Sequence, residues 1–442
     1  MERFILRQLQ EWRNNPKRKP LILKGTRQVG KTFVLNEFGR SSFETFHYFN
    51  FEKEPKLAQI FDPDLNPKRI LQDLSLHRQK KIDFKKELII FDEIQACPKA
   101  LTSLKYFCED LPEAYICCAG SLLGIYFGPV SYPVGKVDHL QMYPMSFVEF
   151  LKATGDSLFV ELLENLTTES KIPPLAHEHL WNRLKHYFIV GGLPEAVSTY
   201  IEHQDDLFVA FEKVRNKQMD LIEDYAADIA KHSGKVNAMH TNRVWRSVPE
   251  QLGLSQNGSA QKFKFKNIIH GVDRFSRLAD SIDWLEAAGL IIKVHIAHQG
   301  LLPLKAFVKE NTFKLFMFDV GILGALSDLA PSTILEYGYG TFKGYFAENY
   351  VAQAFMLETE QLFSWNEGTS EVEFLRQIEG QLIPIEVKSG FVTQAKSLRV
   401  YADRYKPHYR VIMSGKTLTI DNLNRVHNYP LYLASQFPLS HQ

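Results

Sequence analysis

The sequence predicts an α/β protein of several domains, whose N-terminal part is a parallel sheet with helices between its strands. The chain has 442 residues, more than one hydrophobic core usually organises. Its 45% hydrophobic and 23% charged residues are typical of a folded globular protein. Through residues 1–150, short apolar runs alternate with helical patterns, which favours parallel strands joined by crossover helices. The predicted strands are 20–23, 45–51, 87–91, 114–119 and 137–140.

Beyond residue 150 the pattern of the sequence changes three times. Residues 151–235 are helical in pattern and predict a helical connector or lid. Residues 236–335 follow the order helix, helix, hairpin, which predicts a winged-helix-like domain. Residues 336–442 start with a helical pattern at 342–357 and continue with short strands, which predicts a second, small α/β domain. Its predicted strands are 362–365, 371–375, 382–387 and 409–413.

The overall charge and the cysteines exclude several classes of protein. The 52 basic and 51 acidic residues give a net charge of +1, so contact with nucleic acid or an anionic membrane would need a local patch. The four cysteines lack paired spacing and are expected to be reduced thiols of a cytoplasmic protein. An uncharged stretch at 114–135 contains two prolines and four glycines, which favours a buried strand and a loop over a membrane span.

A glycine-rich segment follows the first predicted strand and leads into a helical pattern. Its residues are Gly25, Thr26, Arg27, Gln28, Val29, Gly30, Lys31 and Thr32. This is the G-x-x-x-x-G-K-[ST] pattern of a P-loop, whose backbone N–H groups surround phosphates at a helix N-terminus. Lys31 is expected to reach the β and γ phosphates of ATP, and Thr32 to ligate Mg²⁺. Arg27 is either a phosphate contact or a solvent-facing side chain in a loop that works through its backbone.

Polar residues also follow two later predicted strands. Asp92 comes directly after strand 87–91 and is expected to hold Mg²⁺, while Glu93 is expected to polarise the attacking water as a general base. Ser121 follows strand 114–119. We expect it to sense the γ phosphate, with a turn or capping serine as the alternative.

The motifs together resemble one family, the prokaryotic AAA-type P-loop ATPases of the AAA+ group. These have a C-terminal domain of unknown function that is similar to restriction-endonuclease-like nucleases. The resemblance covers almost the whole chain and implies an ATPase with a winged-helix segment and a nuclease-like terminus. The motifs that carry it are at 25–32, 89–95, 119–121, 143–150, 191–197, 344–351 and 383–390.

The C-terminal domain offers a second group of acidic residues. Glu348 lies in the predicted helix, Glu373 in one strand, and Glu386 with Lys388 on one face of the next strand. Such a set would suit metal-assisted phosphodiester hydrolysis and resembles the (D/E)…(D/E)-x-K pattern of restriction-like nucleases. Glu373 stands where that pattern usually has aspartate. Paired charges at a sheet edge, an active metal site and a binding platform without cleavage therefore all remain open.

Basic residues in the predicted winged helix are candidates for nucleic-acid contact. The run 262–266 alternates lysine and phenylalanine, which predicts a solvated basic face over a buried aromatic face, with phosphate contact as the alternative. Arg274, Arg277 and Lys293 are candidate DNA contacts, although winged helices also bind proteins.

The sequence therefore predicts a cytoplasmic AAA-type ATPase that uses ATP and Mg²⁺ and couples hydrolysis to its C-terminal modules, with nucleic acid as a candidate target. The alternatives are an ATP-gated, metal-dependent nuclease and a nucleotide-binding scaffold for another protein. DNA or protein is the expected partner, and no membrane. Neither the oligomeric state nor an arginine finger can be identified from the sequence.

Overall fold

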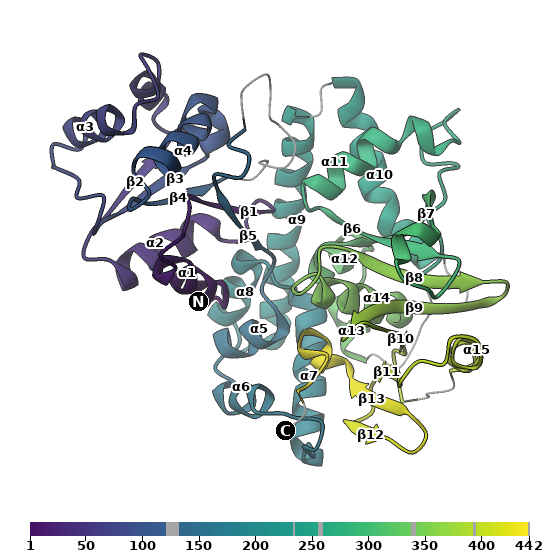
Figure 1. The fold of residues 1–442 in the computed structure, drawn as a ribbon. Helices are drawn as coiled ribbons and strands as arrows, with labels where there is room; N and C mark the ends of the chain where they lie inside the picture. The colour runs from purple at the N-terminus through teal and green to yellow at the C-terminus, as the bar shows by residue number, and fades with distance from the viewer. Residues whose placement is uncertain (121–131, 233–234, 255–259, 337–341, 392–394, 441–442) are drawn as a thin grey trace. The chain divides into compact units, whose positions relative to one another are not determined.

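The computed structural model of the chain describes residues 1–120, 132–232, 235–254, 260–336, 342–391 and 395–440 (Figure 1). The described residues form two compact units, Met1–Tyr143 and Pro144–Gln442. Each unit contains one β-sheet with helices packed against it, and the first sheet is parallel. This confirms the predicted α/β class.

The N-terminal unit is built on five parallel strands in the order β2-β3-β4-β1-β5. All five predicted strands are confirmed to within two residues. Because every strand runs the same way, the carboxyl ends of β1, β3 and β4 lie at one edge, with β4 between the other two. The bounds are β1 Leu21–Gly25, β2 Phe46–Asn50, β3 Leu88–Asp92, β4 Tyr115–Ala119 and β5 Asp138–Met142.

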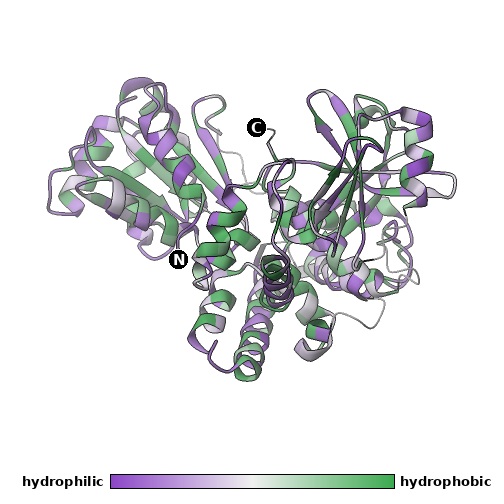
Figure 2. Ribbon diagram, turned by 90° about the horizontal axis from the view of Figure 1, so that it is seen from below, coloured by the Kyte–Doolittle hydropathy of each residue, from purple (hydrophilic) through white to green (hydrophobic). Residues whose placement is uncertain are grey.

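Helices cover both faces of this sheet (Figure 1). On one face lie α3 (Pro67–His77) and α4 (Pro98–Asp110), whose apolar residues share a core with the strands and with the short helices η1 (Pro55–Phe61) and η2 (Ile94–Ala96). On the other face, α1 (Ile5–Asn14) packs on α2 (Lys31–Ser42). Hydrophobic residues gather on the central strands of this unit (Figure 2).

The second unit begins with helices, as the sequence predicts for residues 151–235. A capping box starts the first of them, because Ser146 accepts a hydrogen bond from the backbone of Glu149 and the carboxylate of Glu149 accepts one in return. The predicted helical patterns at 158–165 and 207–230 correspond to α6 and α9. The helices are α5 Phe147–Ala153, α6 Ser157–Glu164, α7 Pro174–Val190, α8 Pro194–Glu202, α9 Leu207–His232 and α10 Lys235–Gly253.

An eight-stranded mixed sheet follows, in the order β12-β13-β11-β10-β9-β8-β6-β7. The four strands predicted for residues 336–442 correspond to β8 to β11, while β12 and β13 were not predicted. The strands are β6 Ile291–Ala297, β7 Val308–Met317, β8 Leu362–Glu367, β9 Ser370–Ile378, β10 Gln381–Val387, β11 Arg410–Ser414, β12 Thr419–Asp421 and β13 Val426–Pro430. The remaining helices are η3 Phe275–Arg277, α11 Ala279–Ala287, η4 Leu304–Phe307, α12 Val320–Leu326, α13 Pro331–Glu336, α14 Phe342–Phe355, α15 Lys396–Tyr405 and η5 Leu431–Gln436.

The predicted hairpin of the winged helix is part of this larger sheet. β6 and β7 pair antiparallel, as expected for a hairpin, but β6 also pairs in parallel with β8. Val294 lies opposite Leu362, and Ala297 lies opposite Trp365. The hairpin therefore shares hydrogen bonds with strands that the sequence assigns to the next domain, and a separate winged-helix domain remains a prediction.

None of the described helices is long and apolar enough to cross a membrane. Within the uncharged stretch at 114–135, residues 115–119 form the buried strand β4, in agreement with the sequence-based expectation.

Candidate functional site

The glycine-rich segment forms the turn between β1 and the N-terminus of α2. Gly25 has a φ of 153°, and a side chain there would collide with the carbonyl oxygen of Met142 on β5. Gly30, at the N-cap of α2, has a φ of 94°, which favours glycine. Both positions therefore need glycine for the backbone to turn directly into the helix, whose N-terminal N–H groups attract anions.

The side chain of Lys31 folds back over this turn. Its Nζ donates hydrogen bonds to the carbonyl oxygens of Gly25 and Thr26, each at 2.8 Å, and the residue is only 8% exposed. Both acceptors are neutral, so a phosphate oxygen would be the stronger partner for the ammonium group. The lysine is thus held beside the place where the loop would bind an anion.

Thr32 and Asp92 come together from two different elements. The Thr32 hydroxyl, on α2, donates to Oδ2 of Asp92, at the end of β3, at 2.8 Å. A hydroxyl and a carboxylate are hard oxygen ligands of the kind that Mg²⁺ prefers. The pair therefore fits the Mg²⁺ ion that the sequence predicts with ATP.

Two residues of β2 that sequence reasoning missed complete this carboxylate's environment. The Tyr48 hydroxyl donates to Oδ2 of Asp92 at 2.6 Å, and Asn50 Nδ2 lies 3.5 Å from the same oxygen and donates to Tyr48 at 3.1 Å. Burial and the hydrogen bond to Asp92 raise the pKa of Tyr48 to about 12, so it remains a donor. Asn50 lies directly opposite Asp92 in the sheet register, a relation that only strand pairing reveals.

Glu93 lies next to Asp92 in a left-handed backbone conformation, with a φ of 50°. Burial raises the pKa of its carboxyl group, a hydrogen bond from Gln95 Nε2 opposes that rise, and the charge of Asp92 adds to it. The charges of Lys31 and Arg27 act in the opposite direction. Glu93 is therefore a partly buried carboxyl group with a raised pKa beside the loop, the property expected of a general base.

The other predicted residues of this site have different outcomes. Arg27 is partly buried, and its charge acts on Glu93, so its phosphate role remains a prediction. Gln28 has a φ of 63°, and the side chain of Val29 is fully buried. Both residues are therefore expected to contact phosphate through their backbone N–H groups. Ser121 lies outside the described residues, just after Gly120, which follows β4.

Arg3 is a further residue that the sequence did not suggest. One guanidinium nitrogen donates to the carbonyl oxygen of Val29 in the loop and the other to that of Tyr143, each at 2.7 Å. The residue is 5% exposed. Arg3 therefore ties the loop to the chain segment after β5.

The predicted acidic residues of the second unit lie together at the middle of its sheet. Glu348 on α14, Glu373 on β9 and Glu386 on β10 are each no more than 5% exposed. Burial raises the pKa of Glu373 well above its usual value, and the charges of Glu386 and Glu348 raise it further. Lys388 donates to Glu386 at 2.6 Å. All four predicted residues therefore belong to one cluster.

Lysine and backbone groups already hold the carboxylates of this cluster. Lys314, on β7 and only 1% exposed, lies 3.7 Å from Glu348 and pairs with Glu371. Burial disfavours its charge, but the surrounding carboxylates outweigh burial and raise its pKa. Glu348 also accepts from the backbone N–H of Ala260 at 3.1 Å.

The cluster has few carboxylate oxygens left for a metal ion. One buried oxygen of Glu386 has no hydrogen-bond partner among the described residues. Among the residues that the structure describes, no group of three or more His, Cys, Asp or Glu side chains is arranged to hold a metal ion. Lysine ammonium groups thus balance carboxylates that the sequence pattern would assign to a metal.

We expect Mn²⁺ to leave the melting temperature of the Lys31→Ala variant unchanged, because Lys314 and Lys388 already neutralise the cluster. The experiment uses Lys31→Ala as its background so that Mn²⁺ bound with nucleotide at the first site does not contribute to the melting temperature. The measurement is a thermal melt with and without Mn²⁺, and the matched control adds Glu386→Ala. An Mn²⁺-dependent rise that disappears with Glu386→Ala would establish a metal site instead.

Glu373→Gln is expected to raise the melting temperature at pH 8 by about 2 °C or more. Because the pKa of Glu373 is raised in the folded state, the folded chain retains a proton that the unfolded chain releases. The free energy of unfolding therefore falls as the pH rises from the unfolded toward the folded pKa, and glutamine removes this dependence. Melts between pH 5 and 8 measure it, with exposed Glu360→Gln as control. An unchanged slope with pH would contradict the prediction.

The candidate DNA contacts of the predicted winged helix differ in their environment. Arg274 and Arg277 are exposed, whereas the side chain of Lys293 is 9% exposed and pairs with Glu286 at 3.2 Å and Asp283 at 3.5 Å. Its ammonium group also lies 5.0 Å from the ring centre of Phe313. Lys293 is therefore already neutralised within the fold and is a poor candidate for a phosphate contact.

Three segments of the chain match known families. Residues 17–151 match an AAA domain, residues 182–333 match a domain of unknown function (DUF8612), and residues 343–432 match another domain of unknown function (DUF4143). No curated protein matches the chain.

Solved structures show more distant likeness. The Walker-type ATPase PABY2304 of Pyrococcus abyssi is 17% identical, with 73% of this chain and 94% of that chain covered and a TM-score of 0.45. AMPPCP-bound DnaA from Aquifex aeolicus is 14% identical, with 64% and 86% covered and a TM-score of 0.28. PCH-2 of C. elegans is 10% identical, with 48% and 66% covered and a TM-score of 0.29.

Proposed function

We propose, from the match of residues 17–151 to an AAA domain, that this chain binds ATP with Mg²⁺ and hydrolyses it. We further propose that hydrolysis powers an action of the second unit on nucleic acid. The observation that carries the proposal is the hydrogen bond of 2.8 Å from the Thr32 hydroxyl to the Asp92 carboxylate, next to the glycine-rich turn and Lys31. It brings a hydroxyl from one element and a carboxylate from another to the edge where an anion would bind.

ATP binding follows from the groups around this turn. The N–H groups at the start of α2 would surround the phosphates, and Lys31 would exchange its carbonyl partners for the β and γ oxygens. Thr32 and Asp92 would hold Mg²⁺, which neutralises charge on the transferred phosphoryl group. Tyr48 and Asn50 keep the carboxylate of Asp92 directed toward Thr32.

Hydrolysis needs a base for the attacking water, and Glu93 is the candidate. Its carboxyl group is partly buried beside the loop and has a raised pKa, which makes it a better proton acceptor than an ordinary carboxylate. The charges of Lys31 and Arg27 favour its ionised form. The hydrogen bond from Gln95 to one oxygen orients the carboxylate, and a carboxylate can accept a further hydrogen bond from water.

Phosphate release from Mg·ATP tests this proposal. The wild-type protein should release phosphate in the presence of Mg²⁺, and release should stop when EDTA removes the Mg²⁺. If hydrolysis is coupled to action on nucleic acid, adding DNA should change the rate. Absence of hydrolysis with and without DNA would contradict the enzymatic part. A rate that DNA never changes would contradict the coupling alone.

A metal-dependent nuclease is the second candidate, because Glu348, Glu373, Glu386 and Lys388 do lie in one cluster. The ammonium group of Lys314 within that cluster argues against it. The Mn²⁺ melt described above decides between them.

A further inference from the structure

The second unit has a strongly basic segment that the candidate ATP site does not use. Residues 260–277 contain five lysine and arginine residues and one acidic residue, a formal charge of +4, whereas the whole chain has +1. The five are all exposed, and Lys264, Lys266, Arg274 and Arg277 form no ion pair among the described residues. The basic residues are Lys262, Lys264, Lys266, Arg274 and Arg277.

Aromatic packing fixes the direction of these side chains. Phe263 is buried and its ring stacks on that of Phe313 of β7, with centres 6.2 Å apart. Phe265 packs on the same ring at 5.8 Å and on Phe275 at 5.5 Å. The three lysines of 262–266 are exposed beside these packed rings. The contact between Phe265 and Phe275 brings η3, with Arg277 at its end and Arg274 at its N-cap, close to this segment.

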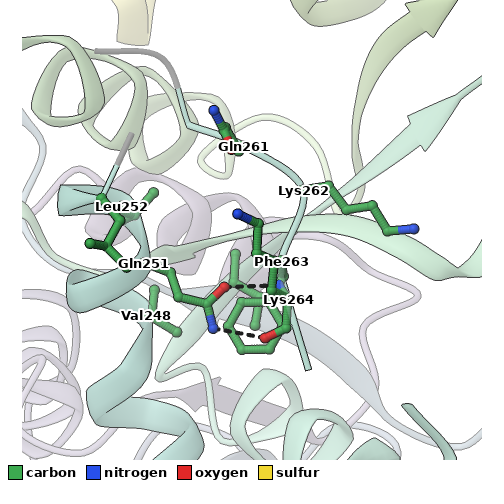
Figure 3. A pocket seen from close by; sticks show the side chains of 9 residues that line it. Val248, Gln251, Leu252, Gln261, Lys262, Phe263 and Lys264 are labelled. Carbon is green, nitrogen blue, oxygen red and sulfur yellow. Dashed lines mark hydrogen bonds between the residues drawn. The ribbon is translucent and has the colours of Figure 1, made fainter. Parts of the chain in front are cut away.

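Hydrogen bonds hold the backbone of the same segment on both sides. Phe263 donates to the carbonyl oxygen of Phe313 at 2.9 Å. Gln251 of α10 accepts from the N–H of Lys264 at 2.8 Å and donates to its carbonyl oxygen at 2.9 Å (Figure 3). Lys262 extends away from this contact in the same view. The lysines are therefore carried on a fixed backbone.

The cavity beneath this segment is not itself a ligand site. It lies between α10 and residues 261–264 and has a volume of about 40 Å³. A water molecule needs about 10–15 Å³ of such space, so the cavity has room for a few waters but not for a nucleotide base. Recognition would have to occur on the outer face.

We propose that the outer face of residues 260–277, here called the basic face, binds the phosphate backbone of double-stranded DNA. A duplex carries one phosphate charge per about 1.7 Å of its axis, a charge density that suits several exposed cations on one short segment. The proposal rests on the proposed action on nucleic acid but needs no ATP.

Charge and composition favour DNA over other anionic partners. A membrane-bound surface needs exposed apolar residues to enter the lipid, and none of the large exposed hydrophobic residues lies within 260–277. Protein interfaces depend on aromatic anchors, and the phenylalanines here are packed inward. A group of exposed cations without large exposed apolar side chains is suited to a phosphate backbone.

The test is binding of a labelled 20-base-pair DNA duplex in EDTA, without ATP, at several salt concentrations. Five phosphate contacts predict a slope of log K against log salt of about −4.5. Lys262→Gln/Lys264→Gln/Lys266→Gln should weaken binding on the order of 100-fold at 0.1 M salt and reduce the slope to about −2. Arg274→Gln/Arg277→Gln should reduce the slope by about 2 units.

Matched controls separate the basic face from general charge. Lys171→Gln/Lys213→Gln removes two exposed lysines of the same unit outside 260–277 and should reduce the slope by less than one unit. Thermal melts check that each variant is folded. Equal binding by wild type and the triple variant would overturn the proposal. So would binding to vesicles with 20% phosphatidylserine that exceeds DNA binding and is lost in the triple variant.

The proposed function can fail separately. DNA binding that requires the basic face, in a chain that releases no phosphate, would remove only the ATPase proposal. Phosphate release without any DNA binding would overturn the basic face and leave hydrolysis intact.

Discussion

Replacing Lys31 with alanine is expected to weaken ATP binding on the order of 100-fold or more. The two hydrogen bonds that its ammonium now gives to Gly25 and Thr26 would go to phosphate oxygens, and each charge-assisted bond is worth about 1.5–3 kcal/mol. No other side chain of the loop offers a buried cation in this position, since Arg27 is only partly buried. Calorimetric titration with Mg·ATP measures the effect.

Two further variants make the Lys31 result interpretable. Lys31→Met keeps the aliphatic stem and should show the same loss, because the missing group is the charge. Arg27→Ala distinguishes the two interpretations of that residue, since a phosphate contact would cost about tenfold or more and a solvent-facing side chain would cost little. Unchanged affinity in both Lys31 variants, with normal melting, would contradict the phosphate site.

Glu93→Gln is expected to lower turnover on the order of 100-fold or more while ATP affinity stays the same. Glutamine keeps the size of the side chain but cannot accept the proton of water, and general-base catalysis contributes about 10² to 10⁴. Because the pKa of Glu93 is raised, wild-type turnover should fall as the pH drops through that pKa. Steady-state phosphate release across pH measures both effects.

The control for Glu93 is Glu37→Gln, a partly exposed carboxylate on α2 whose closest ion pair, with Arg40, is 3.6 Å long. It should leave turnover and its pH dependence unchanged. Turnover of Glu93→Gln near that of wild type would place the base elsewhere.

The sequence predicted the N-terminal fold and the phosphate loop well because both depend on local signals. A strand that is buried on both faces has the sequence of a short apolar run. β3 is an example, since every one of its residues is buried. Gly30 is needed because the backbone there has a positive φ. Gly25 is needed because β5 approaches it closely. Neighbours along the chain therefore carry most of this information.

Residues brought together by distant parts of the chain were missed. Tyr48 reaches Asp92 only because β2 pairs with β3, and Arg3 bonds Tyr143, which is 140 residues away. Lys314 lies on a strand that the sequence assigns to the winged helix, so its charge could not be added to the C-terminal acidic group. The pattern identified the acids and Lys388 but not Lys314, which lies 3.7 Å from Glu348.

The pairing of β6 with β8 affects how this protein can be divided. One family match ends at residue 333 and the next begins at 343, yet hydrogen bonds between Ile291–Ala297 and Leu362–Glu367 join the two segments. A fragment that starts at residue 336 would leave the outer side of β8 without its neighbour, an open edge that invites aggregation. We therefore expect that the two matched segments of the second unit do not fold independently, and that a cut between them yields insoluble halves.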